Sequence, residues 1–312
     1  MELRIRNLSK TYANGVVALD KVTLTIPAGM FGLLGPNGAG KSTLMRTLAT
    51  LQECDSGSVF FGDLDVLDEK DEIRRLLGYL PQDFGVYPKV SAEDMLDHLA
   101  RLKGLSNKAE RAEIVAGLLR QTNLYEVRKK ALGGFSGGMR QRFGIAQALI
   151  GRPLLIIVDE PTAGLDPEER TRFHNLLVEI GEEVIVLLST HIVSDVCDLC
   201  PNLAIMNQGR VLVTGTPQQL VASLAGRVWS TSVAREQVAA LRERHAVIST
   251  RLYTGQTQIH VIADARPGAD FAPVEATLED AYFAAIGGWL AGARAASRRG
   301  VAAGAVTAAP VH

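Results

Sequence analysis

Hydrophobic and polar positions follow two patterns along the first two thirds of the chain. Residues 2–34 alternate apolar and polar side chains in places, as at 22–26, which is typical of half-buried strands. The apolar runs 154–158 and 184–188 have the length of strands buried on both faces. Helical spacing predicts helices at 41–50, within the charged segment 91–130, and at 137–150. Strands alternating with helices predict a mainly parallel α/β sheet with helices on both faces.

Shorter elements complete the predicted organisation. We expect a hairpin around 59–64, a strand at 76–80, a last hairpin from Gly209, and a short helix capped at Thr216 that ends near Leu224. Beyond 227 the pattern changes to a helix at 234–244 and strands at 247–253 and 257–262. We therefore predict one domain over 1–224 and a small α+β domain over 227–287. Residues 288–312 are rich in Ala, Gly and Arg and lack a packable pattern, so we expect them to be disordered.

Composition narrows the class of protein. The 312 residues are 47% hydrophobic and 21% charged, which is ordinary for a soluble protein with a sizeable core. The formal charge of −1 gives no global field toward nucleic acid, so no nucleic-acid partner is expected. The first ten residues have no apolar signal segment, the apolar runs are too short to span a membrane, and the cysteines are sparse. These features predict a cytoplasmic protein that serves a membrane only through a partner.

The segment GPNGAGKST at 35–43 fits the pattern G-x-x-x-x-G-K-[ST] between a predicted strand and a predicted helix. Glycines let the backbone N–H groups surround a phosphate, and the helix N-terminus adds positive potential. Lys41 is expected to reach the β- and γ-phosphates, and the Ser42 hydroxyl to ligate Mg²⁺. The predicted ligands are therefore a nucleoside triphosphate, which the family resemblance described below implies is ATP, and Mg²⁺, with nucleotide contacts from Gly35, Asn37, Gly38, Gly40, Lys41, Ser42 and Thr43.

Further polar residues follow the predicted strands. Asp159 ends an apolar strand, at the edge where ligands of such sheets bind, and is expected to hold Mg²⁺ directly or through water. Glu160 is then placed to act as the general base toward water. Gln82 and His191 also follow strands, where they could meet metal or water and the γ-phosphate; taken alone, such a residue is more often an ordinary surface group. Tyr12 is a candidate for stacking on adenine, or a core aromatic.

A second anion-binding turn lies at FSGGMRQR, residues 135–142, where Ser-Gly-Gly opens a basic helix. Its place in the ordered series GPNGAGKST, LPQ, FSGGMRQR, LLIIVDEP, AGLD and STH explains it. Over about residues 2–222 this series resembles the nucleotide-binding domain of ATP-binding-cassette (ABC) ATPases. The resemblance implies a P-loop domain with a mixed core sheet, a helical subdomain at about 88–152 and an antiparallel β subdomain.

The resemblance also assigns roles to residues. In the family two cassettes pack head to tail, so Ser136, Gly137 and Gly138 would bind the γ-phosphate of ATP held by the other subunit of a homodimer. Asp166 would be an inter-subunit contact. The remaining roles concern one subunit: Tyr12 would stack on adenine, Gln82 would sense the metal and couple to a partner, Asp159 would hold magnesium, Glu160 would be the base, and His191 would sense the γ-phosphate.

Some features resemble one branch of the family. Three features resemble the ATPases of ABC-2-type exporters. They are Met139 in the anion-binding turn at 135–142 (the signature turn), LGYLPQ at 77–82, and the closing helix at 276–283. That branch implies separately encoded transmembrane permease subunits, a peripheral location on the cytoplasmic face of the inner or plasma membrane, and a groove beside Gln82 and Tyr87 that receives a permease helix. An importer ATPase, or a soluble ABC protein outside transport, remains open. Cys197 and Cys200 have C-x-x-C spacing, but without further ligands we expect a buried, inert pair.

Overall fold

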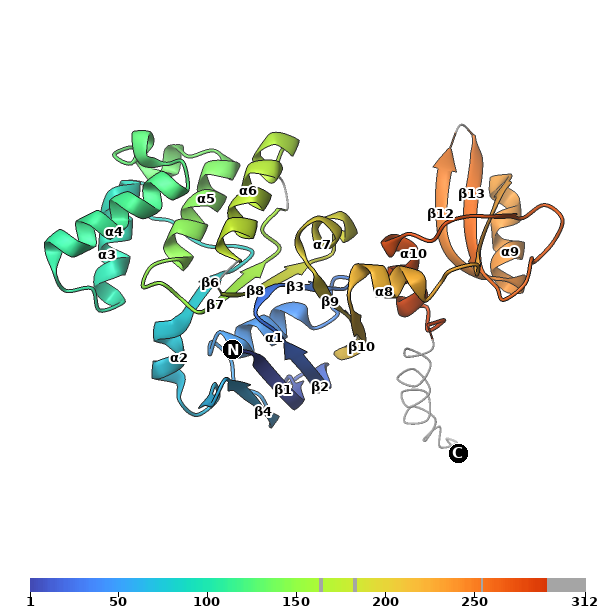
Figure 1. Cartoon of the computed structure of the whole chain (residues 1–312), viewed down its shortest axis with the longest axis horizontal. Helices are drawn as coiled ribbons and strands as arrows, with labels where there is room; N and C mark the ends of the chain where they lie inside the picture. Colours follow the sequence, from blue (N-terminus) through green and yellow to red (C-terminus); the bar gives the residue numbers. More distant parts are fainter. Residues whose placement is uncertain (163–164, 182–183, 254, 291–312) are drawn as a thin grey trace, which may run out of the picture.

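The computed structural model describes residues 1–290 except 163–164, 182–183 and 254 (Figure 1). A six-stranded mixed sheet forms its centre, and all neighbouring pairs are parallel except β9 and β10. Across the sheet the strands are β10 (Arg210–Gly215), β9 (Asn202–Asn207), β3 (Gly29–Leu34), β8 (Ile185–Thr190), β7 (Leu155–Asp159) and β6 (Leu77–Leu80). The α/β prediction is confirmed. Because β3, β6, β7 and β8 are parallel, the segments that follow them emerge at one edge of the sheet.

A four-stranded antiparallel sheet packs against one face of this centre, with helix α1 (Lys41–Leu48) between them (Figure 1). Its strands are β2 (Val17–Ile26), β1 (Leu3–Thr11), β4 (Ser56–Phe61) and β5 (Leu64–Asp65). Leu44 and Leu48 of α1 share one hydrophobic core with side chains of both sheets. Helix α2 (Lys70–Leu76) joins this core through Ile73 and leads directly into β6. The phosphate-loop helix is thus fixed from two sides.

Helices α5 (Gly137–Ala148), α6 (Pro167–Ile180) and α7 (Val193–Leu199) lie on the other face of the central sheet. Helices α3 (Ala92–Leu102) and α4 (Lys108–Gln121) extend outward beside α5 (Figure 1). Two single turns of 3-10 helix, η1 (Tyr125–Val127) and η2 (Leu132–Gly134), connect α4 to α5. These helices enclose a separate hydrophobic core, so α5 joins the outer helices to the central sheet.

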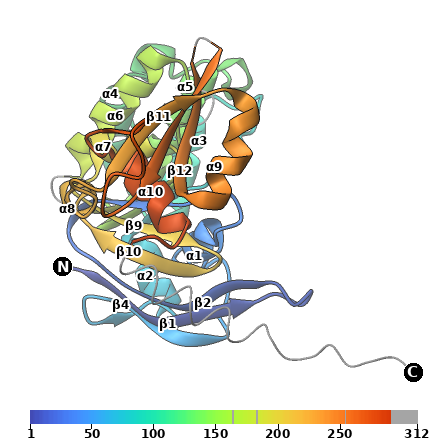
Figure 2. The same cartoon turned by 90° about the vertical axis from the view of Figure 1, so that its right-hand side faces the viewer.

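The chain after helix α8 (Pro217–Ala222) forms a third, antiparallel sheet. Its order is β12 (Ala246–Tyr253), β13 (Gln256–Ile262), β11 (Val228–Val233) and β14 (Ala272–Pro273), with η3 (Arg235–Gln237) and α9 (Val238–Arg244) between β11 and β12. Helix α10 (Leu278–Ile286) lies between this sheet and strands β9 and β10, and it also packs on α7 and α8 (Figure 2).

The predicted division into domains 1–224 and 227–287 stays a prediction. The hydrophobic core of the central sheet continues through Leu278 and Tyr282 of α10 into the third sheet. Of the tail predicted to be disordered, residues 291–312 lie outside the described residues, whereas Trp289 and Leu290 pack against this core. In the described part of the chain, no helix is long and apolar enough to cross a membrane.

Candidate functional site

The loop between β3 and α1 has the backbone geometry that its glycines allow. Gly40 precedes α1 with φ 99°, and a Cβ there would lie 2.3 Å from the carbonyl oxygen of Ala18. A Cβ on Gly35 would lie 2.3 Å from the carbonyl oxygen of Met206. Gly38 also has a positive φ, 79°, but it faces open space, and Asn37 beside it is exposed. The loop therefore packs tightly at both ends and is open in the middle, where a ligand could lie against backbone N–H groups.

Lys41 begins α1 and is 4% exposed. Its Nζ donates to the carbonyl oxygens of Gly35 at 2.7 Å and Pro36 at 3.2 Å, and it lies 3.5 Å from Oε1 of Glu160. Burial lowers the pKa of Lys41, while Glu160 and Asp159 act to raise it. The first turn of α1 contains no acidic side chain of its own, and the carboxylates near this helix end come from Asp159 and Glu160 after β7.

Asp159 ends β7 and is buried, and its Oδ1 has no partner of hydrogen-bonding geometry. Burial raises the pKa of Asp159, and the neighbouring hydroxyls of Ser189 and Ser42 oppose that rise. An orphaned, buried carboxylate oxygen beside a serine hydroxyl needs a positive partner. Oxygen donors of this kind suit Mg²⁺. The residues present therefore fit the predicted metal, with Ser42 and Asp159 as its holders.

Glu160 and His191 meet at the same edge of the sheet. Glu160 has φ 48°, an uncommon conformation for a residue other than glycine, and its N–H donates to the carbonyl oxygen of Ser189 at 2.9 Å. Its Oε2 lies 3.1 Å from Nδ1 of His191, which follows β8. The Glu160 side chain is 10% exposed and that of His191 is 44% exposed. Strained backbone that is held by its surroundings is characteristic of active sites.

Two other predicted residues, Tyr12 and Gln82, lie at the surface. The Tyr12 hydroxyl is 3.1 Å from Oγ1 of Thr43 and 3.0 Å from Oε1 of Gln52, and the residue is 38% exposed. Tyr12 is therefore not a core aromatic, and its ring stands at the surface next to α1. Gln82 follows β6 and is exposed.

The signature turn forms the start of another helix. Ser136 caps α5, its Oγ accepting the Met139 N–H at 3.2 Å, and both Ser136 and Gly137 are exposed. A Cβ on Gly138 would lie 2.5 Å from Oε2 of Glu169, so this glycine permits close packing on α6. Asp166 caps α6 by accepting the Glu169 N–H at 2.9 Å. Among the described residues, no hydrogen bond or ion pair of this group involves the phosphate loop. Within one chain, the predicted site residues thus form two separate groups.

Sequence reasoning missed two residues at the site. Ser189 at the end of β8 is fully buried beside Asp159, and its Oγ also lacks a partner of hydrogen-bonding geometry. Its place in the motif STH was a usable signal. Asp195 on α7, four residues beyond His191, is fully buried and carries a charge that the sequence pattern did not mark.

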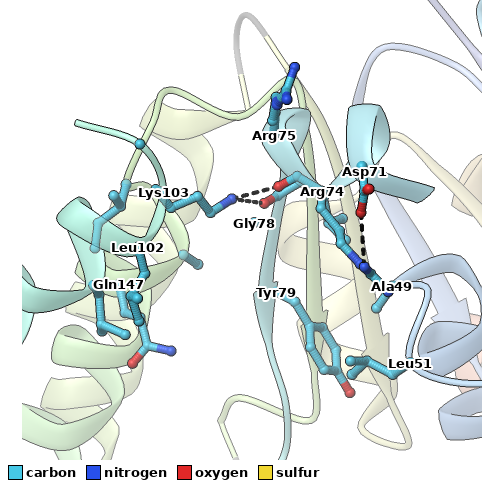
Figure 3. Close-up of a pocket in the computed structure, with 15 residues that line it drawn as sticks. Ala49, Leu51, Asp71, Arg74, Arg75, Gly78, Tyr79, Leu102, Lys103 and Gln147 are labelled. Atoms are coloured by element: carbon cyan, nitrogen blue, oxygen red, sulfur yellow. Dashed lines mark hydrogen bonds and ion pairs between the residues drawn. The ribbon is translucent and has the colours of Figure 1, made fainter. Parts of the chain in front are cut away.

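A cavity of about 710 Å³ lies away from the phosphate loop, between the end of α1, α2 and β6 on one side and α3 and α5 on the other (Figure 3). Lys103 spans its rim, its Nζ donating to the carbonyl oxygens of Arg74 at 2.8 Å and Leu77 at 2.7 Å. Leu51 and Leu102 line it and are largely exposed. The cavity therefore combines exposed apolar side chains with a basic rim.

Comparison with known proteins agrees with this geometry. Residues 19–163 match the family model described as ABC transporter. The chain is 35% identical over 257 residues to the uncharacterized ABC transporter ATP-binding protein YxlF of Bacillus subtilis, covering 82% of this chain and 84% of that protein. This chain is an ABC transporter ATP-binding protein. The cassette is also 37% identical over 241 residues to the daunorubicin/doxorubicin resistance ATP-binding protein DrrA of Streptomyces peucetius, covering 76% of this chain and 72% of that protein.

Solved structures resemble the cassette in fold. An ATP-binding subunit of an ABC transporter superposes with a TM-score of 0.64 at 30% identity, covering 71% of this chain and 92% of the other. A dimeric ATP-binding cassette in a post-hydrolysis state, bound to ADP and Pi, superposes with a TM-score of 0.63 at 27% identity and covers 69% of this chain and 98% of its own. The predicted family and fold are confirmed. One correction concerns the cysteines: Cys200 is buried, but Cys197 is exposed on α7, so they do not form a buried pair.

Proposed function

We propose that this chain is the ATP-hydrolysing subunit of an ABC exporter and works as a homodimer on separately encoded membrane subunits at the cytoplasmic face of the membrane. One observation carries the catalytic part. Glu160 is held in a strained conformation between the buried ammonium of Lys41 and the ring of His191, next to Asp159. A carboxylate that lies beside the lysine of a phosphate loop is suited to accept a proton from a water molecule that attacks the γ-phosphate.

The surrounding residues divide the remaining work. Lys41 and the open N-terminus of α1 bind the β- and γ-phosphates, and Tyr12 offers its exposed ring to adenine. Mg²⁺, held by Ser42 and Asp159, neutralises phosphate charge when it is bound. Glu160 accepts the proton of the attacking water, and His191 keeps that carboxylate oriented while facing the γ-phosphate. Gln82 is proposed to sense the metal from the end of β6.

The second group of residues supports a dimer. At the turn 136–138, Ser136 and Gly137 are exposed, Gly137 faces open space, and the first turn of α5 has no acidic side chain of its own, whereas Gly138 is buried against Glu169 of α6. We assign this turn and Asp166 to the nucleotide of the other subunit. Dimer closure would then depend on the γ-phosphate, so hydrolysis would release the interface.

The cavity of Figure 3 is the proposed seat of a permease helix. It lies beside Tyr79 and Lys103, whereas the sequence prediction placed the groove next to Gln82 and Tyr87. Leu51 and Leu102 suit the apolar face of a short helix, and the rim cations Arg75 and Lys103 suit an acidic residue on it. Names of relatives such as DrrA, a drug-resistance protein, favour export over import. An importer ATPase or a soluble ABC protein is the alternative.

Replacing Glu160 by Gln tests the catalytic assignment. The variant keeps the size of the side chain but cannot accept the proton, so we expect turnover to be lost and an ATP-bound dimer to accumulate in size-exclusion chromatography. Unchanged ATP hydrolysis would refute the assignment. The companion variant Ser136→Arg should bind ATP as a monomer yet fail to dimerise, and loss of ATP binding by the monomer would contradict the shared-site proposal.

The transport assignment has its own test. Tagged E160Q protein is extracted from native membranes with ATP and Mg²⁺ present, and the proteins that co-purify are identified. A polytopic membrane protein in equal amount supports the transporter assignment, and its topology separates exporter from importer. Only soluble partners, with no membrane association, would favour the non-transport alternative.

A further inference from the structure

A fully buried carboxylate, Asp195, lies behind the two strand ends that carry Glu160 and His191. Its Oδ2 accepts hydrogen bonds from Oγ1 of Thr162 at 2.6 Å and Oγ1 of Thr190 at 3.3 Å. Thr162 follows Glu160 by two residues, and Thr190 immediately precedes His191. One carboxylate oxygen thus joins the two segments whose neighbouring residues are proposed to act on the γ-phosphate.

The other oxygen, Oδ1, is held by helix α6. Arg170 donates to it through Nε at 2.8 Å and also through a second guanidinium nitrogen, and Nε2 of His174 lies at 3.1 Å. A buried carboxylate without such partners would be strongly destabilising, and the guanidinium and the imidazole ring give Oδ1 its partners and fix Asp195 in one orientation. Because Oδ1 is fixed by these partners, Oδ2 keeps one position toward the two threonines.

The hydroxyl of Thr190 extends this connection to the backbone around His191. Besides donating to Asp195, it accepts the N–H of Ile192 at 3.0 Å, so it holds the chain on both sides of His191. On the other segment, the Glu160 N–H donates to the carbonyl oxygen of Ser189, the residue before Thr190. The two segments are consequently linked both at their backbones and through Asp195.

We propose that Asp195 is a positioning residue that fixes the segments of Glu160 and His191 relative to each other, through Thr162 and Thr190. The inference rests on the proposed roles of those two residues in ATP hydrolysis. Among the described residues, no hydrogen bond or ion pair of Asp195 involves the phosphate loop or the metal holders, so it sets how well the base is aimed rather than how well ATP binds. Small displacements of a catalytic group can cost about 100-fold in rate.

Thr→Val substitutions preserve the side-chain shape but remove one of the two hydrogen bonds that Oδ2 of Asp195 accepts, from Thr162 or from Thr190. For T162V and for T190V we expect kcat for ATP to fall about tenfold, roughly 1.4 kcal/mol, with KM for ATP unchanged because Lys41 and Ser42 lie on another segment. T122V is the matched control: Thr122 is 1% exposed and donates to the Leu118 carbonyl oxygen at 2.8 Å, but it lies at the end of α4, outside the site. T122V should keep both kinetic constants.

The double variant T162V/T190V tests whether the two threonines act through the same residue, Asp195. Because the loss of either hydrogen bond already uncouples the segments, kcat of the double variant should fall little further than kcat of a single variant. For T162V/T122V, by contrast, the fall in kcat should equal the product of the two single effects. D195E keeps a carboxylate at this position, so it should retain more ATP hydrolysis than D195N.

Three outcomes would overturn the inference. They are wild-type kcat in T162V and T190V, a rise of KM in step with the loss of kcat, or a loss of kcat that follows the loss of Tm across all variants including T122V. Failure of the proposed function gives a different result: full hydrolysis by E160Q, or no hydrolysis by the wild-type chain. The two failures are therefore distinguishable.

Discussion

Replacing Gly40 by Ala should remove ATP binding while leaving the fold largely intact. Gly40 has φ 99°, and an added Cβ would lie 2.3 Å from the Ala18 carbonyl oxygen and 3.0 Å from Cε of Met206. The left-handed backbone costs an L-residue about 1–2 kcal/mol, and forcing an extra carbon into packed surroundings costs about 1–3 kcal/mol. In the free protein the loop can move to relieve about 2–5 kcal/mol, but ATP binding must restore the strained conformation. Since about 1.4 kcal/mol corresponds to a tenfold change in Kd, the low end of this sum, about 2 kcal/mol, weakens ATP binding about 30-fold.

Gly226→Ala is the matched control for this experiment. Gly226 has φ 70° but faces open space, so it carries the backbone strain without the collision, and it follows α8, outside the site. Equilibrium titration with a fluorescent ATP analogue gives the affinity, and thermal unfolding gives Tm. We expect G40A to lose affinity with a modest fall in Tm, and G226A to lose Tm alone. Wild-type affinity in G40A would refute the claim that this loop binds the nucleotide in the conformation described.

Two further predictions concern buried ionisable groups. Burial acts to raise the pKa of Asp280, but hydrogen bonds from His260 and Thr277 outweigh this effect and hold that pKa below its ordinary value of 3.8. The variant D280N loses these interactions of the carboxylate. It should therefore lower the free energy of unfolding by about 1–3 kcal/mol at neutral pH. Urea titrations should show this difference fully above pH 3.8 and vanishing as the pH falls through the lower folded-state pKa, whereas a constant difference would contradict the pairing. Burial raises the pKa of Cys200 to about 12, so iodoacetamide near neutral pH should alkylate the exposed Cys197 and reach Cys200 only in urea, as peptide mapping would show; equal rates in the folded protein would contradict that burial.

The sequence predicted the central strands and the phosphate loop well because local signals specify them. The apolar run 154–158 corresponds to β7, and the glycines of GPNGAGKST stand where the backbone is left-handed or closely packed. Thr216 caps α8 by accepting the Gln219 N–H, and its own N–H donates to Oε1 of Gln219, as its position before a proline suggested. Helix α2 was missed because its seven residues offer one buried side chain, Ile73, too few for a periodic signal. Strand β11 was missed for a related reason, since its buried side chains include the polar residues Ser230 and Thr231, one on each face of the strand.

The candidate site divides in the same way. Lys41, Asp159 and Glu160 belong to short motifs whose chemistry shows in the residue types, so the sequence alone was enough to propose them, and their roles stay predictions. Asp195 belongs to no such motif, because its function depends on partners 33, 25 and 5 residues away that only the fold brings together. The sequence records which groups can perform chemistry, whereas what holds them in place is distributed over β7, β8, α6 and α7. Asp195 can be replaced without altering any of these motifs, and the Thr162 and Thr190 variants test how this residue is connected to the segments of the motif residues Glu160 and His191.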